Sequence, residues 1–509
     1  MTALIALPVL LPILGAAITV IGSRSPTLQR MVGVVVLLAV SVIAVVLLVE
    51  SDARGPLVAE LGGWAAPVGI SLVADRLSAL LLLVSALVTL AVLVYAIDQR
   101  IADYGRGTVS TTFHPMYLML SAGVSLAYLT GDLFTLFVAF EIMLTASYVL
   151  ITRRTSAAKI RAGMTYVTVS LLSSLLFLTA IGLVYAATGT VNLADLAGRI
   201  ELLPPGLVTV LGLMLLVVFG IKAAMVPLHF WLPDSYPTAP GPVAALFAGL
   251  LTKVGFYAML RTQTLLFHRE EPWTLLLVLS VATMLVGALG ALAQNDVNRL
   301  LSFLLVSHIG FMLFGLAVFD AAGVSGAALY AAHHITVLAT LFLVSGLITR
   351  RTGTVALDRM GGLARTAPGL AVLFAIPALT LAGVPPTAGF VAKLALLQAG
   401  VAAGPWTTAV AGVVIIASLL TLYALARVWV RVFWGEPKPA LPDDDPDDEV
   451  VVGTAERTPV PMYSATAGLV AVSLAIAVFA GPLSAVTGRA GVDLLDREPY
   501  RTAVLGVGP

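Results

Sequence analysis

Apolar residues run through this sequence in blocks of about 20, without the polar face that a soluble amphipathic helix keeps. A bilayer core of roughly 30 Å needs about 20 apolar residues per helix, so each block predicts a membrane-spanning helix. The fourteen predicted spans lie near 2–22, 30–50, 72–97, 113–130, 132–151, 160–187, 206–230, 240–262, 272–293, 297–319, 324–349, 368–401, 405–434 and 460–487. The predicted fold is an all-α polytopic membrane protein.

Composition supports this fold and excludes several kinds of chemistry. The 509 residues are 59% hydrophobic and 11% charged, with a mean hydropathy of +1.03. The chain has no cysteine, which excludes disulfides, thiolate metal sites and iron–sulfur ligation. It carries neither a phosphate-binding glycine loop nor a dinucleotide fingerprint, and its net charge is only +1. We therefore expect no cofactor, no metal and no nucleic acid, and we expect the lipid bilayer to surround the chain.

Basic residues in the short loops predict the orientation. They concentrate after the fifth span (Arg153, Arg154, Lys159, Arg161) and after the eleventh (Arg350, Arg351, Arg359, Arg365). If these loops face the cytoplasm, both termini lie outside a bacterial cell membrane. The acidic run DDDPDDE at 443–449 then lies in a cytoplasmic loop, where its prolines and charges are typical of a solvated linker rather than a cation site.

Ionisable residues inside the spans are the candidate chemistry. The chain has five lysines against 23 arginines, and three of the five, Lys222, Lys253 and Lys393, lie within spans. Arginine stays protonated essentially always, whereas a buried lysine can lose and regain a proton. Each intramembrane charge costs about 2.5–3.5 kcal/mol on insertion scales, which indicates a function or a partner for it.

These groups share one depth in the membrane. Glu141 lies twelve residues before Arg153, about 18 Å along a helix, which places its carboxyl near the midplane. Lys253 reaches a similar depth, thirteen residues after Pro240. A structural ion pair between Glu141 and Lys222 is the alternative, but two further amines without an acid favour proton transfer.

Prolines predict breaks in two of these spans. Lys222 precedes Pro227, and Lys393 follows Pro385 and Pro386. Proline removes a backbone donor and clashes with the preceding turn, so the seventh and twelfth spans should break or kink. Transporter sites are often built at such breaks, although a kink without a role is the alternative.

Spacing also predicts an internal repeat. The two lysines are 393 − 222 = 171 residues apart, and this shift carries the fourth span onto the ninth. Five helices then correspond to the next five, and an odd number inverts the second copy. The predicted organisation is three N-terminal helices, two five-helix repeats, an acidic cytoplasmic loop, and a last helix with its tail, over 1–110, 111–262, 263–434, 435–459 and 460–509.

Histidines offer relay groups, because imidazole titrates near neutral pH. His308 lies in the tenth span and His333 and His334 in the eleventh, although a packed structural role is the alternative. His229 and Asp234 lie beside the break after Lys222, where protons could enter or where the residues are simply interfacial. A metal site here is not expected, because the histidine spans supply no third ligand.

Several runs resemble one known family as an ordered group, from the fourth to the thirteenth span. They are FEIMLTASYVL, GIKAAMVPLHFWLPDSYPTAPGPVAAL with LLTKVGFYAMLR, RLLSFLLVSHIGFMLFG, and LAGVPPTAGFVAKLALL. They resemble the antiporter-like subunits shared by Mrp-type cation/proton antiporters and respiratory complex I. The N-terminal run GGWAAPVGISLVADRLSAL resembles the D-type branch of the Mrp subunits.

The resemblance implies fourteen helices with two inverted five-helix repeats. It implies a glutamate–lysine pair at Glu141 and Lys222, a central lysine at Lys253, and the end of the proton path at Lys393. Leu338 departs from the family pattern, which usually has a lysine there, so the connection between the halves would depend on water and on His333 or His334.

The expected function is a proton-translocating subunit of a multisubunit Na⁺/proton antiporter, with the other subunits as partners. The alternatives are a proton-pumping subunit of an NADH:quinone oxidoreductase and a membrane scaffold without its own ion path.

Overall fold

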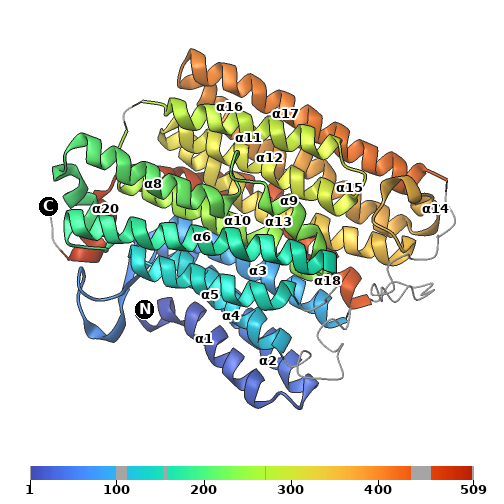
Figure 1. Ribbon diagram of the computed structural model, residues 1–509, viewed down its shortest axis with the longest axis horizontal. Coiled ribbons are helices and arrows are strands. Elements are labelled where there is room, and N and C mark those ends of the chain that lie inside the picture. Colours follow the sequence, from blue (N-terminus) through green and yellow to red (C-terminus); the bar gives the residue numbers. More distant parts are fainter. Residues whose placement is uncertain (1, 99–111, 153–156, 270, 437–459, 507–509) are drawn as a thin grey trace.

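A computed structural model describes residues 2–98, 112–152, 157–269, 271–436 and 460–506. The helices lie side by side along one direction (Figure 1). They are α1 (Thr2–Ile21), α2 (Pro26–Arg54), α3 (Arg76–Asp98), α4 (Phe113–Leu129), α5 (Leu133–Ile151), α6 (Ala157–Thr188), α7 (Leu193–Arg199), α8 (Pro205–Ala223), α9 (Trp231–Ser235), α10 (Gly241–Leu265), α11 (Thr274–Leu292), α12 (Val297–Val318), α13 (Ala321–Thr352), α14 (Leu363–Thr366), α15 (Pro368–Ala382), α16 (Ala388–Ala402), α17 (Pro405–Trp429), α18 (Val460–Val478), α19 (Ala480–Leu495) and α20 (Glu498–Leu505). The acidic run at 443–449 lies outside the described residues.

All fourteen predicted spans are helical over most of their length. Within the described ranges, twelve helices are long and apolar enough to cross a membrane. The two spans without such a helix are the fourth, where α4 has only 17 residues, and the twelfth, which divides into α15 and α16. The prediction of a polytopic all-α membrane protein is confirmed.

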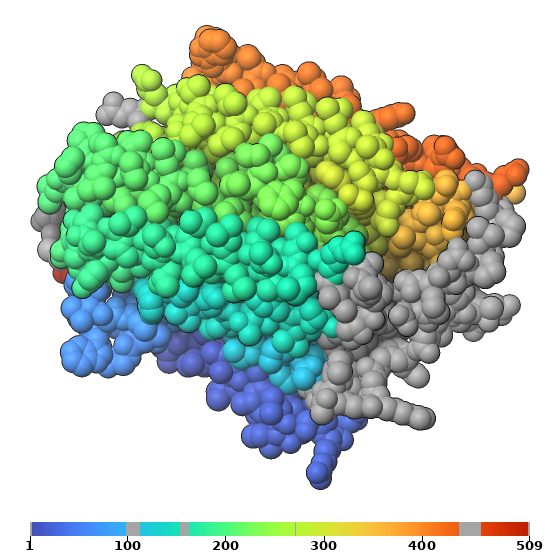
Figure 2. All heavy atoms as spheres, viewed as in Figure 1, coloured from blue at the N-terminus to red at the C-terminus, as the bar shows by residue number. Residues whose placement is uncertain are grey.

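Three helices form the centre of the bundle. In the most apolar window of α10, α12 and α13, 100%, 94% and 94% of the residues are buried, against 33% in α2 and α17. α17 and α1 with α2 lie at opposite edges in Figure 1. Side chains of α6 and α8 form a continuous surface on the face drawn in Figure 2. Polar side chains on the three central helices are therefore shielded from lipid.

Both predicted breaks are present. α8 ends at Ala223, Ala224 takes the left-handed conformation at φ 59°, and a non-helical stretch with Pro227 leads to α9. α15 ends at Ala382, and Gly383 takes the same conformation at φ 85° before Pro385, Pro386 and the start of α16. Glycine adopts this conformation without penalty, whereas alanine costs about 1 kcal/mol, so the first break is held by its surroundings.

Two kinds of landmark occur twice along the chain, at spacings shorter than the 171 residues from which the repeat was predicted. Asp132 caps α5 through the Thr135 amide at 2.6 Å, and Asp296 caps α12 through the Arg299 amide at 2.9 Å. The caps are 296 − 132 = 164 residues apart and the left-handed residues 383 − 224 = 159. Both spacings differ from 171, because Lys222 precedes its break while Lys393 follows its break, and the five-helix repeat stays a prediction.

The two capping aspartates are also electrostatically alike. Burial raises the pKa of the Asp132 carboxyl and of the Asp296 carboxyl, and the backbone amides that they accept from oppose that rise. Both carboxyls lie just outside the helices that they cap.

A β-hairpin between α2 and α3 has no counterpart in the sequence prediction. Strands β1 (Leu57–Glu60) and β2 (Ser71–Ala74) pair antiparallel, with Leu57 opposite Ala74 and Glu60 opposite Ser71. The Gly131 amide donates to the Ser71 carbonyl at 2.8 Å, so the hairpin holds the turn between α4 and α5. Each strand has four residues, too few for an alternating pattern to stand out.

Candidate functional site

Lys222 lies in the last turn of α8, directly before the break. Its side chain is buried, and the ammonium donates to the Ser174 hydroxyl at 3.2 Å and the Ser170 carbonyl at 3.4 Å, both on α6. It also lies 5.4 Å from the centre of the Phe140 ring. A cavity of about 20 Å³ beside it, lined also by Tyr166 and Trp231, has room for about one water molecule. The Lys222 amine therefore has polar contacts within largely apolar surroundings.

Glu141 does not form the direct ion pair with Lys222 that was expected. The two side chains are not within ion-pair distance, although Glu141 acts electrostatically on the ammonium. Glu141 is half-buried, and its Oε1 is buried without a hydrogen-bond partner in the described protein. It lines an open groove between α4 and α5 with Met116, Phe137 and Thr145. Their attraction therefore acts at longer range.

Lys253 is the most enclosed of the amines. It lies on α10 with a relative exposure of 0%, and its ammonium donates to the Ala248 carbonyl of the same helix. Gly255 lets α10 approach the end of α8, because a methyl group there would lie 2.7 Å from the Ala223 nitrogen. Lys222 and Lys253 are therefore on directly packed helices.

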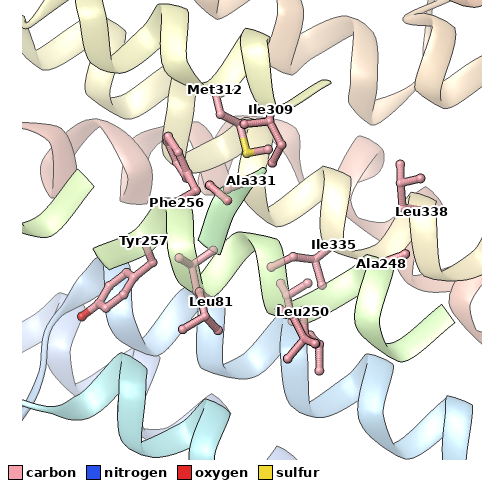
Figure 3. Packing of buried hydrophobic residues seen from close by; sticks show 14 of the residues in the cluster. Leu81, Ala248, Leu250, Phe256, Tyr257, Ile309, Met312, Ala331, Ile335 and Leu338 are labelled. Atoms are coloured by element: carbon pink, nitrogen blue, oxygen red, sulfur yellow. The ribbon is translucent and has the colours of Figure 1, made fainter. Parts of the chain in front are cut away.

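Apolar side chains surround this part of α10. Figure 3 shows Ala248, Leu250, Phe256 and Tyr257 of α10 among Leu81 of α3, Ile309 and Met312 of α12, and Ala331, Ile335 and Leu338 of α13. α10 and α13 are close here, since a methyl group at Gly249 would lie 3.3 Å from Ala339 Cβ. Leu338, at the position where the family resemblance implies a lysine, is fully buried hydrocarbon.

Three histidines lie within electrostatic reach of Lys393, and two of them, His308 and His334, also lie within reach of Lys253. All three are buried, and the His308 and His334 rings stack with centres 5.3 Å apart and planes 4° apart. Both lysines act electrostatically on His334. The ring nitrogens of His333 and His334 have no hydrogen-bond partner within the described protein, so these imidazoles have open hydrogen-bonding capacity.

Lys393 lies on α16, beyond the second break. Its ammonium donates to the carbonyls of Leu381 and Ala382 at 2.9 and 2.8 Å, which are at the open end of α15. It also lies 4.9 Å from the centre of the Phe311 ring, which stacks on His308. Lys393 therefore bridges the two parts of the broken helix and approaches the histidines.

The two residues proposed for the place where protons enter are less enclosed. His229 is half-buried in the non-helical stretch after α8, and its Nδ1 has no partner in the described protein. Asp234 on α9 is 58% exposed and forms a 2.9 Å ion pair with Arg299 of α12. Asp234 thus joins the first break to the second half of the chain.

Comparison with known proteins identifies the family. Residues 130–421, more than half of the chain, match the family described as NADH:quinone oxidoreductase/Mrp antiporter, TM. The chain belongs to this antiporter family. The matched segment contains Glu141, the three buried lysines and the three buried histidines.

Relatives in the antiporter family cover nearly the whole chain. The D-type Na(+)/H(+) antiporter subunit of Alkalihalophilus pseudofirmus is 40% identical over 86% of this chain and 88% of its own length. The D-type Na(+)/H(+) antiporter subunit of Bacillus subtilis is 36% identical over 98% of each.

Two solved structures share the fold. A chain of the Mrp complex from Dietzia sp. has a TM-score of 0.90 at 34% identity, covering 99% of this chain and all of that one. A chain of the membrane-bound sulfane sulfur reductase, an archaeal respiratory membrane complex, has a TM-score of 0.85 at 25% identity, covering 98% and 99%.

Several side chains at this antiporter-family site escaped the sequence analysis. Ser170 and Ser174, one helical turn apart on α6, hold Lys222. Tyr330 precedes His334 by four residues and so shares its helix face, a spacing that could have been noticed. Thr421 reaches His308 from α17, and no signal in the sequence connects them.

Proposed function

We propose that this chain is the proton-translocating subunit of a multisubunit Na⁺/proton antiporter in the cell membrane, in a hetero-oligomer with other antiporter subunits. One observation carries the proposal. Lys222, Lys253 and Lys393 are buried in the antiporter-family fold, and none of them forms an ion pair with a carboxylate in the described part of the chain. Unpaired buried amines exchange protons more readily than they serve stability.

The geometry supports transfer in one order. A proton on Lys222 is attracted by Glu141 from a distance, and this attraction sets how long it stays. When the attraction weakens, like-charge repulsion favours movement toward Lys253 and then through the histidines to Lys393. Na⁺ moves in the opposite direction through the complex, and no chemical bond other than those to hydrogen is made or broken.

The orientation that we propose follows the basic loops. The end of α13, with Arg350 and Arg351, faces the cytoplasm, and both termini face outward. Under this assignment the two five-helix units, 111–262 and 263–434, lie in opposite senses across the membrane.

Everted membrane vesicles from a host without its own Na⁺/proton antiporters test the proposal, with the whole complex expressed. Glu141→Gln and Lys222→Ala should each reduce Na⁺-dependent proton release to the level of vesicles without the complex. Glu50→Gln is the matched control, since it removes a carboxylate that pairs with Arg54 at the end of α2. Wild-type exchange by both site variants, with normal amounts of assembled complex, would refute the proposal.

A pumping subunit of an NADH:quinone oxidoreductase is the second candidate, because the description of the matched family names that enzyme beside the Mrp antiporter. Co-purification separates the two functions. Recovery of small antiporter subunits supports the first, and recovery of dehydrogenase or quinone-site subunits supports the second.

A further inference from the structure

Tyr330 is a buried ionisable residue that the proposed path does not use. Its hydroxyl lies 2.6 Å from Nδ1 of His308, and Thr421 Oγ1 lies 3.2 Å from Nε2 of the same ring. The three residues come from α13, α12 and α17, so both ring nitrogens are held from different helices.

The hydrogen bonds at Thr421 favour one tautomer of His308. When the hydroxyl hydrogen of Thr421 is donated to the Ala417 carbonyl at 2.9 Å, the Thr421 oxygen accepts from Nε2. Nε2 must then carry the hydrogen of the neutral imidazole. Nδ1 is left bare, and Tyr330 donates its hydroxyl hydrogen to it.

A proton arriving at neutral His308 can therefore bind only at Nδ1. Once it has bound, Nδ1–H donates to the Tyr330 oxygen and Tyr330 turns its own hydrogen away. Both N–H groups of the imidazolium keep an acceptor, and hydrogen bonds from a charged donor are about twice as strong as neutral ones.

We propose that Tyr330 is a positioning residue of the proton path, which makes Nδ1 of His308 the proton-accepting atom and stabilises the imidazolium formed there. The inference rests on the proposed function, because it requires protons to pass through His308.

The ionisable groups around His308 also act on the positive charge that forms on its ring. The ionisable groups that face it are Lys253 of α10, Lys393 of α16, and Tyr330, His333 and His334 of α13. α17 contributes the uncharged Thr421, and α11 has no ionisable residue in its sequence. The positive groups oppose a charge on His308, so the acceptor supplied by Tyr330 matters more.

Tyr330→Phe tests the inference in vesicles containing the whole complex, with Na⁺-dependent exchange measured across pH. Loss of the acceptor destabilises the imidazolium more than the neutral ring, so the pH for half-maximal exchange should fall by roughly one unit. Thr421→Val, on another helix, should shift it the same way, and Thr421→Ser should restore the wild-type profile. Tyr117→Phe is the control, because it removes a buried 2.6 Å hydrogen bond from Tyr117 of α4 to the Thr89 carbonyl of α3.

The variants distinguish a failure of the role assigned to Tyr330 from a failure of the path through His308. If Tyr330→Phe and Thr421→Val both keep the wild-type profile while His308→Asn abolishes exchange, the role of Tyr330 is overturned and the path stands. If His308→Asn exchanges like the wild type, protons do not pass through His308 and the inference is overturned, while the exchange that this variant retains leaves the proposed antiporter function standing. A shift in Tyr117→Phe equal to that in Tyr330→Phe would also overturn the inference, because it would then follow from any lost buried hydroxyl.

Discussion

The ammonium of Lys393 bonds to two peptide carbonyls at the end of α15, where the helix dipole favours positive charge. Its aliphatic chain lies against Gly383, where a side-chain carbon would be 2.7 Å from Lys393 Cδ. A proton on Lys393 therefore stabilises the break itself. Loss of that proton leaves two N–H donors for the two carbonyls but removes the positive charge that strengthens both hydrogen bonds between α16 and α15.

Lys393→Arg tests whether this amine must release its proton. The guanidinium stays charged, so the variant should assemble while Na⁺-dependent exchange falls to background at every pH. Arg199→Lys, in the exposed pair with Asp195 at 2.9 Å, should exchange normally. Wild-type exchange by Lys393→Arg would remove Lys393 from the path.

The residues of the candidate site could be chosen from the sequence alone, because an amine in an apolar span is conspicuous. Their contacts could not. Glu141 was expected to touch Lys222, but the ammonium turns toward Ser170 and Ser174 on α6. Serine is common in helices of every kind, so nothing marks these two as lysine partners in advance.

At the scale of elements, the breaks depend on close backbone packing as well as on proline. Gly389 in the first turn of α16 lies against α15, and a methyl group there would overlap the Thr380 carbonyl and lie 3.1 Å from His333 Cε1. This tight contact fixes the positions of α15 and α16 relative to each other and to α13, which carries His333.

Gly389→Ala should therefore separate α15 from α16, lower the melting temperature of the purified complex by an amount equivalent to about 1–3 kcal/mol, and reduce exchange. Gly412→Ala in α17 is the matched control. Nothing lies within 4 Å of the added methyl, and helix propensity favours alanine by up to about 1 kcal/mol. Equal melting temperatures for the two variants would contradict the packing argument.

The positions of the helices followed from apolar length, and the positions of both breaks followed from the prolines. The short length of α4 and the presence of the hairpin were not predicted. α4 lies almost wholly within the bundle, where burial by neighbours replaces the need to span lipid alone. β1 and β2 are fixed by pairing with each other and with the turn at Gly131, a tertiary effect that no local pattern contains.

At the scale of the whole molecule, one buried ion pair fastens the N-terminal helices to the centre. Asp75, at the start of α3, meets Arg261 of α10 at 2.5 Å, and both side chains are under 10% exposed. The guanidinium also lies 5.3 Å from the centre of the Tyr500 ring on α20. Elements from both ends of the chain therefore close over α10, an arrangement that local sequence patterns do not predict because the partners are far apart in sequence.

Arg261→Ala leaves the Asp75 carboxylate buried without its partner, which typically costs about 3–5 kcal/mol. The melting temperature of the purified complex should fall strongly. Arg261→Met with Asp75→Asn should recover most of the loss, since neither charge remains. A double variant as unstable as Arg261→Ala would show that packing against Tyr500, rather than the charge pair, holds this end together.

Lys222 and Lys393 differ in the hydrogen-bonding groups that contact their amines. Lys222 bonds to a serine hydroxyl, which can rotate and offer its hydrogen instead, whereas Lys393 bonds only to carbonyls, which accept and never donate. A neutral Lys222 thus keeps a hydrogen-bond partner in Ser174, but a neutral Lys393 faces two acceptors with one donor fewer. The first break therefore offers a neutral amine a possible donor as well as an acceptor, whereas the second break offers it acceptors alone.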